Sequence, residues 1–178
     1  FLYHKGFDVR QMKISYLENK KGRRMRGGST ISMQTAKNAF LPHNRTVLRK
    51  ALEAYYTVLI ECVWGKKRIM EVYLNIIEFG DGIYGCEAAA QHYFGHSCKD
   101  LTPREAAQLA ASLPGPLAFN PGKPNRRYTR HVEVLIGRHS RWGMVDLDKP
   151  ASQLNPKYME RETLFDFAWW LLTDGEKM

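Results

Sequence analysis

Apolar residues recur at helical spacing along two consecutive stretches of the chain. Residues 48–64 carry them in steps of three and four, and Gly65 follows where a helix C-cap belongs. The same spacing predicts a second helix over residues 66–79, which Gly80 ends. Its inward-facing residues are expected to be Ile69, Val72, Tyr73, Ile76 and Ile77.

A third helix has a strong start signal. Thr102 can cap it, Pro103 suits its first position, and Glu105 can complete a capping box. It should run to about Leu113, where a Pro-Gly-Pro segment stops it. Further helices are expected after Ser29 and over roughly residues 128–137 and 161–172. No alternating pattern of useful length predicts a strand, so the fold class is mainly α.

The composition fits one compact globular domain over residues 1–178. Hydrophobic residues make up 44% of the chain and charged residues 25%. No apolar run approaches the roughly 18 residues that span a bilayer. The net charge of +9 has two explanations: a solvated basic face that aids solubility, or an anionic partner. The excess lies in residues 1–68, which hold 15 basic and 4 acidic side chains.

The three cysteines form no Cys-x-x-Cys pair. Cys62 lies in an apolar helical stretch and is expected to be a small core residue. Cys86 and Cys98 are close enough in sequence to pair in an oxidising compartment, and the sequence leaves that question open.

Two glycines, Gly27 and Gly28, lead into a helix whose first turn offers free amide groups to an anion. Ser29 and Thr30 stand at its mouth, and Lys37 shares a face with Gln34. These residues could hold a phosphate or a sugar. A capped surface helix is the alternative reading, and the order of a Walker motif is absent.

A basic cluster follows around Glu53. Arg49 and Glu53 are four residues apart, which by itself describes a common surface ion pair. With Lys37, Arg45 and Lys50 nearby in sequence, the same residues would suit a diphosphate leaving group whose charge develops as a bond breaks. Glu53 could bind a metal, orient a cation or act as a base, and spacing does not choose among these roles.

Five stretches, in order, resemble the motifs of the peptidoglycan glycosyltransferases of glycosyltransferase family 51. These are the polymerising domains of class A penicillin-binding proteins and of monofunctional transglycosylases. The stretches are residues 1–8, 27–38, 49–53, 67–85 and 88–116. No transpeptidase signature is present.

The resemblance implies a lysozyme-like, bilobal helical fold with one membrane-facing lobe. It implies an enzyme that joins lipid II into β-1,4 glycan strands with inversion and releases undecaprenyl pyrophosphate. Its partners would be lipid II, the growing glycan strand and an anionic membrane surface, not nucleic acid. The expected place is the outer face of the bacterial cytoplasmic membrane, with a transmembrane anchor upstream of this chain. No cofactor is required, and a divalent cation, Mg or Mn, stays open.

The resemblance also assigns roles to residues. Glu53 takes the place of the second essential glutamate of the family, beside the pyrophosphate or holding a cation. The residues expected to line the substrate site are Phe1, His4, Ser29, Thr30, Gln34, Lys37, Asn38, Arg45, Arg49 and Lys50.

Two departures qualify these expectations. The first motif of the family begins with a Glu-Asp pair that would lie upstream of Phe1, and its Glu is the family's general base. The chain as printed is therefore predicted not to polymerise lipid II. Met33 stands where the family has the first of two glutamines, which puts one polar donor-site contact in doubt.

Two other functions stay open. The chain could be a catalytically incompetent module that binds lipid II or a membrane. It could also be a lysozyme-like lytic hydrolase, which needs no pyrophosphate site and would leave the basic cluster unexplained.

Overall fold

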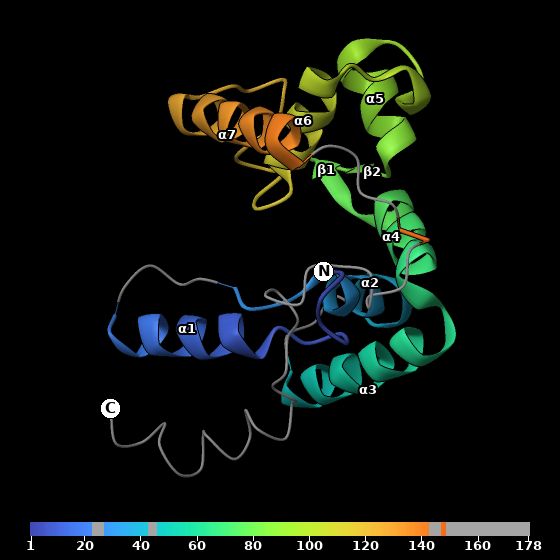
Figure 1. The fold of residues 1–178 in the computed structure, drawn as a ribbon, viewed down its shortest axis with the longest axis vertical. Helices are drawn as coiled ribbons and strands as arrows, with labels where there is room; N and C mark the ends of the chain where they lie inside the picture. Colours follow the sequence, from blue (N-terminus) through green and yellow to red (C-terminus); the bar gives the residue numbers. More distant parts are fainter. Residues whose placement is uncertain (23–26, 43–45, 143–146, 149–178) are drawn as a thin grey trace. The chain divides into compact units, whose positions relative to one another are not determined.

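A computed structural model describes residues 1–22, 27–42, 46–142 and 147–148, apart from the side chain of Trp142. Seven α-helices dominate these residues, which confirms the mainly α class (Figure 1). The chain divides into two compact units. The first unit comprises residues 1–70 and the segment from Leu147 onward, and the second comprises residues 71–146.

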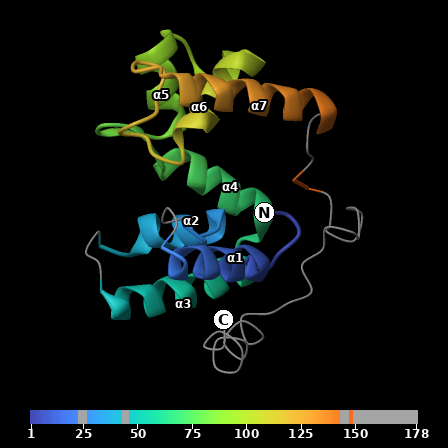
Figure 2. The same ribbon diagram turned by 90° about the vertical axis from the view of Figure 1, so that its left-hand side faces the viewer.

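The first unit contains α1 (Val9–Lys20), α2 (Ile31–Phe40), α3 (Val47–Val63) and the start of α4 (Gly65–Ile76). The side chains of Asp8, Thr30 and Thr46 cap the first three helices by accepting backbone N–H groups. The sequence reading missed α1, whose residues are mostly polar. Helix α2 packs along α3, as the views in Figures 1 and 2 both show.

Polar side chains occupy much of the interior between α2 and α3. Ser32, Thr35, Glu53 and Thr57 are all buried. The Thr57 hydroxyl donates to the carbonyl of Glu53 at 2.6 Å, so this buried hydroxyl has a hydrogen-bond partner in its own helix. A small apolar cluster of buried Ala36, Ile60 and Ile69 completes this core.

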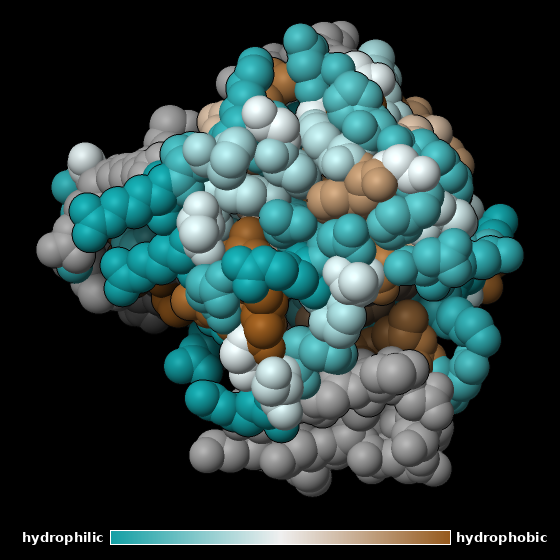
Figure 3. All heavy atoms as spheres, turned by 90° about the horizontal axis from the view of Figure 1, so that it is seen from above, coloured by the Kyte–Doolittle hydropathy of each residue, from teal (hydrophilic) through white to brown (hydrophobic). Residues whose placement is uncertain are grey.

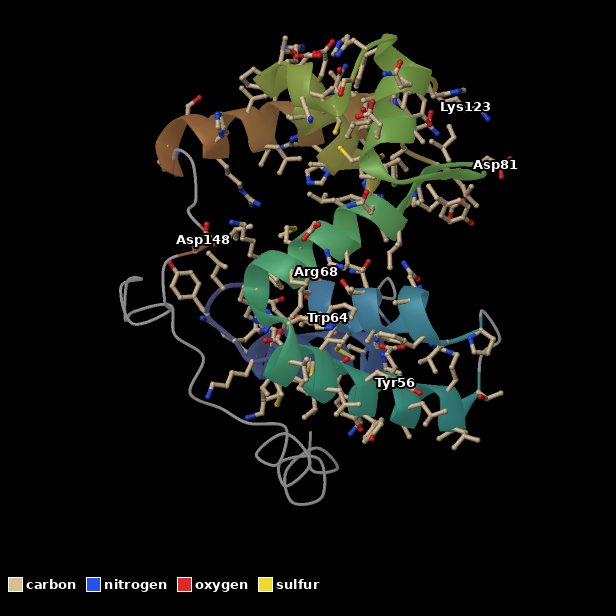
Figure 4. The ribbon with its side chains drawn as sticks, turned by 90° about the vertical axis from the view of Figure 1, so that its right-hand side faces the viewer. Tyr56, Trp64, Arg68, Asp81, Lys123 and Asp148 are labelled. Atoms are coloured by element: carbon tan, nitrogen blue, oxygen red, sulfur yellow. The ribbon has the colours of Figure 1, made fainter. Side chains whose placement is uncertain are left out.

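The outward face of α3 is apolar. Val47, Leu48, Leu52, Tyr55, Val58, Leu59 and Val63 are exposed on it. Cys62 is also exposed, so the expectation that it is a core residue was wrong. Toward the interior, Tyr56 and Trp64, labelled in Figure 4, lie 5.0 and 5.8 Å from the ring of Phe40.

The second unit begins within α4. It continues through β1 (Glu78–Gly80), β2 (Ile83–Tyr84), α5 (Cys86–Phe94), the 3-10 helix η1 (Cys98–Asp100), α6 (Pro103–Ser112) and α7 (Arg126–Trp142). Strands β1 and β2 pair antiparallel. Helices α6 and α7 pack together over a core of Ala107, Ala111, Tyr128 and Val132.

Local chemistry explains how this unit differs from the sequence prediction. The capping box at Thr102 and Glu105 is confirmed. The helix predicted over 66–79 instead ends at Ile76, and a short strand pair follows. Gly85 then takes a φ of +87°, and a Cβ there would lie 2.7 Å from the carbonyl oxygen of Asn75. Only glycine fits this turn.

Three other expectations concern the later part of the chain. Helix α7 is longer at both ends than the predicted 128–137. The helix predicted over 161–172 lies outside the described residues. Cys86 and Cys98 are both free and half-buried, so they form no disulfide in this structure. None of the described helices has the length and apolar character needed to cross a bilayer.

Candidate functional site

Glu53 is a buried carboxylate held by two cations of its own helix. Its side chain is 3% exposed. One carboxylate oxygen accepts from Arg49 Nη1 at 2.9 Å, and the other accepts from Lys50 Nζ. The i,i+4 and i,i+3 spacing in α3 places both cations on the face of Glu53. The two charged donors compensate the unfavourable removal of this carboxylate from water.

The N-terminus of α2 lies beside this cluster. Lys50 Nζ also donates to Ser29 Oγ at 3.4 Å, which joins α3 to the residue just before the α2 cap. Thr30 is buried, caps α2 through Met33 N and donates to the carbonyl of Gly6. The first amides of a helix point outward and favour an anion. Helix end and cations therefore form one electropositive region.

Arg49 has further capacity to donate. Its side chain is 16% exposed, and one of its guanidinium nitrogens is paired with Glu53. The buried Nε of Arg49 has no hydrogen-bond partner among the described residues. A buried donor without an acceptor is unfavourable. An oxygen of a bound anion would satisfy it.

A second, half-buried carboxylate, that of Glu61, lies about two turns further along α3. It accepts from Ser32 Oγ and from Lys66 Nζ, the latter at 2.6 Å. Lys66 Nζ also donates to the carbonyl of His4 at 2.6 Å and lies 4.7 Å from the centre of the Phe1 ring. Phe1 and His4 are thus fixed by the Glu61–Lys66 pair.

The imidazole of His4 is buried, and this burial lowers its pKa to about 4, with help from the nearby charge of Lys66. His4 is therefore neutral near pH 7 and adds no positive charge for an anion. Its Nδ1 has no hydrogen-bond partner in the described part of the chain.

The remaining predicted site residues lie on α2. Gln34, Lys37 and Asn38 are half-buried and share one helix face by their spacing. Met33 is 3% exposed and packs in the interior. It therefore presents no side chain to a ligand. Arg45 lies outside the described residues.

The described residues contain no group of three or more side chains arranged to hold a metal ion. Both oxygens of Glu53 already face cations. A divalent ion at Glu53 would have to displace Arg49 or Lys50, so this donor set does not suit one.

Sequence reasoning missed Glu61, Lys66 and Ser32. One signal was present: Glu61 is an acidic residue inside the apolar stretch that follows Glu53. A charge in such a place is buried with a partner more often than not. The contact of Glu61 with Ser32, 29 residues away in sequence, and that of Lys66 with His4, 62 residues away, could not be predicted from spacing.

The fold and the site define a class of protein: a mainly helical domain with an electropositive helix end built around a buried, cation-paired carboxylate. The model of the transglycosylase family matches residues 1–139. This chain belongs to that family.

Individual relatives agree with the family match. A biosynthetic peptidoglycan transglycosylase of Caulobacter vibrioides is 53% identical over 149 residues, 82% of this chain and 65% of the relative. Proteins of the same name from Pasteurella multocida and Ectopseudomonas mendocina are 46% and 43% identical, over 83% and 96% of this chain and 61% and 66% of their own lengths. The chain thus spans less than two thirds of these relatives.

Proposed function

We propose that this chain is the glycan-polymerising part of a peptidoglycan glycosyltransferase and binds the pyrophosphate of lipid II at Arg49, Lys50 and the N-terminus of α2. The observation that carries the proposal is the position of Glu53. It is buried, and it holds two cations beside a helix end on the helix whose outer face is apolar. A ligand such as lipid II has both an anionic headgroup and a lipid tail. The cations and the helix end would bind the headgroup, and the apolar face of α3 would contact the tail.

The reaction needs stabilisation of a leaving group. The 4-hydroxyl of the acceptor sugar gives its proton to a general base other than Glu53 and attacks the anomeric carbon of the donor, and a β-1,4 bond forms with inversion. The bond from that carbon to the pyrophosphate breaks, and the pyrophosphate keeps the electron pair. Lys50, Arg49 and the α2 amides would neutralise the charge that develops on its oxygens. Gln34, Lys37 and Asn38, on one face of α2, would contact the donor sugar or phosphate.

Glu53 acts as a positioning residue in this proposal. A general base needs a carboxylate oxygen free to accept a proton from the attacking hydroxyl. Both oxygens of Glu53 are already in ion pairs. Its role is to keep Arg49 and Lys50 in one orientation, which lowers the entropy lost when a pyrophosphate binds. The proposal requires no cofactor.

The apolar face of α3 supports a membrane contact. Val47, Leu48 and Val63 are 89%, 71% and 75% exposed. An exposed apolar stripe on a single helix is unfavourable in water and typical of an interfacial helix. We place this face in the outer leaflet of the bacterial cytoplasmic membrane, where it would meet the lipid of the donor. The basic residues 1–68 would add attraction to anionic lipids.

Donor binding is the step that tests the proposal, because it precedes deprotonation of the acceptor. Binding of lipid II and of undecaprenyl pyrophosphate would be measured in detergent micelles by intrinsic fluorescence. Lys50→Ala should weaken both by roughly tenfold or more, because a charge-assisted hydrogen bond to phosphate contributes about 1.5–3 kcal/mol. Lys123→Ala is the control: it removes the same charge from an exposed site in the second unit.

The results of these and two further measurements distinguish the proposed transferase from a lytic hydrolase and from a binding module. Equal binding by wild type and Lys50→Ala would contradict the proposed donor site. Release of soluble muropeptides from purified sacculi would favour a lytic hydrolase. Lipid II binding that depends on Lys50, without any glycan formed by this chain or by longer versions of it, would favour a binding module.

A further inference from the structure

A cavity of about 320 Å³ opens on the second unit, away from any residue assigned above. It lies between α6, the loop after it and α7. Its floor and walls are apolar and come from Ala111, Pro114, Phe119, Tyr128 and Val134. The hydroxyl of Tyr128 donates to the carbonyl of Gln108 at 2.8 Å, so the wall is fixed by a hydrogen bond between the two helices.

The rim of the cavity is cationic. Arg127, Arg130 and His131 line it, and the guanidinium of Arg127 lies 5.2 Å from the centre of the Phe119 ring. Arg127 and Arg130 have no carboxylate partner among the described residues, whereas Arg104 is paired with Glu133 at 2.7 Å. Glu133 is the single acidic residue of α7, which carries five arginines. Among the described residues, the positive charge of the rim is therefore not compensated.

The spacing of α7 brings these groups together. Arg127, Arg130, His131 and Val134 follow each other in steps of three, one and three, and lie on one helix face. The face therefore has an apolar hollow beside the guanidinium groups of Arg127 and Arg130, and guanidinium groups bind carboxylates in a planar, two-point geometry. In Figure 3 hydrophilic residues likewise surround small apolar areas on the face toward the viewer.

We propose that this cavity is a docking site for an acidic segment of a partner protein, which inserts one large apolar side chain and places flanking carboxylates on Arg127 and Arg130. The shape favours this occupant over a bilayer. On α3 the apolar side chains project outward, whereas here the apolar atoms line a hollow. A hollow of this volume accepts a single indole or phenyl group and leaves the cations at its edge for charges next to it in sequence.

The test uses three blocked pentapeptides: Glu-Asp-Trp-Asp-Glu, the same peptide with Ala for Trp, and Lys-Lys-Trp-Lys-Lys. Amide shifts of the protein would be followed by ¹⁵N NMR. The first peptide should shift the amides of Phe119, Tyr128 and His131. Loss of the indole should weaken binding about tenfold or more, because it removes one large buried apolar group. The lysine peptide should not bind at the cavity.

Two variants and a matched control separate the contribution of the rim charge to peptide binding from that of the apolar hollow. Arg130→Glu should weaken the acidic peptide about tenfold or more by reversing one rim charge, and Arg141→Glu, the same change near the end of α7, should have less than about a threefold effect. Val134→Trp should fill the hollow without changing the charge and should also abolish binding. Arg130 and Val134 are exposed, so circular dichroism and the melting temperature should be unchanged in both.

Three outcomes would overturn the proposal. One is no shift at the cavity with millimolar acidic peptide. Another is equal binding of the Trp and Ala peptides, or equal loss in Arg130→Glu and Arg141→Glu, which would indicate diffuse charge attraction. The third is a response of the same amides to phosphatidylglycerol vesicles but not to the peptide, which would make this face a membrane contact.

Discussion

The two units of the molecule differ in the side chains that they bury between their paired helices. Between α2 and α3 the first unit buries Glu53, Ser32 and Thr57. Between α6 and α7 the second unit buries alanines, a valine and a tyrosine. Burying a carboxylate and its cations is less favourable than burying apolar groups of the same volume. The first unit therefore gives up stability at the place where we propose that it binds a ligand, and the α6–α7 interior of the second unit is apolar.

The outer surfaces show the reverse pattern. Helix α3 exposes apolar residues along its length, and α7 exposes arginines. The first surface suits lipid and the second suits carboxylates. Apolar periodicity therefore shows where an apolar stripe lies on a helix, but it does not show whether that stripe faces the protein interior or the exterior.

The largest expected effect concerns the exterior of α3. Replacing Leu48, Tyr55 and Val58 together by Ser should lower binding to phosphatidylglycerol vesicles by about 1,000-fold or more, because each apolar side chain removed from water contributes about 1.5–3 kcal/mol. The three side chains are 71%, 58% and 48% exposed, so the free energy of unfolding should hardly change. Vesicle co-sedimentation measures the first quantity and urea denaturation the second.

Leu117→Ser provides the comparison for this experiment, because Leu117 is 61% exposed in the second unit. It should leave vesicle binding as it is. If Leu117→Ser weakened binding as much as the triple variant, the membrane contact would not belong to α3.

Much of the fold could be predicted from sequence where the information is local. The helices at 47–63 and 103–112 follow from apolar spacing and from capping chemistry within a few residues. The pair β1 and β2 is too short to produce an alternating pattern. Helix α1 lacks an apolar stripe and depends on its Asp8 cap. The exposed side of Cys62 could not be predicted, because an apolar stripe normally faces inward.

The same distinction holds for the candidate site. The Arg49, Lys50 and Glu53 cluster was predicted from spacing within one helix turn. The burial of Glu53 was not, because it depends on α2 lying across that face. The contacts of Lys66 with His4 and of Ser32 with Glu61 join segments 62 and 29 residues apart and required coordinates.

The next largest effect tests the rigid turn of the second unit. Gly85→Ala should destabilise the protein by about 3 kcal/mol, because a Cβ at positive φ is strained and here also meets a backbone oxygen. Gly82 has a φ of +71° with nothing within 4 Å of its Cβ position. Gly82→Ala should therefore lose only about 1 kcal/mol. Urea denaturation measures both, and equal losses would mean that the contact with Asn75 is unimportant.

A smaller loss is expected from the polar interior of the first unit. Glu53→Gln keeps the shape but places an uncharged amide between two cations, so unfolding free energy should fall by about 2 kcal/mol. This figure is below that for a fully buried pair because Lys50 is 50% exposed. Glu133→Gln breaks the exposed pair with Arg104 and should change stability by less than about 0.5 kcal/mol. Similar losses for the two variants would show that Glu53 is not held as described.

The smallest effect is a pH dependence of opposite sign in the two units, carried by one histidine in each. Burial lowers the pKa of His4 to about 4, so its stability contribution is complete above pH 6.5 and is lost as the pH falls toward 4. His96 behaves oppositely. Hydrogen bonds to the Ser97 carbonyl and to Glu105 raise its pKa, so its contribution is present below pH 6.5 and is lost as the pH rises through the folded-state pKa.

Hydrogen exchange resolved by segment would measure this difference between pH 8 and pH 5, after correction for intrinsic rates. Protection of α2 and α3 should fall by about 1–2 kcal/mol, a value reduced for partial solvent screening of His4, while protection of α5 and α6 should rise slightly. In His4→Asn the first change should vanish and the second should stay, and in His96→Asn the reverse should hold. If acid weakened both units alike in all three proteins, the two histidines would not be the titrating groups, and the contrast between a polar and an apolar interior would not extend to their response to protons.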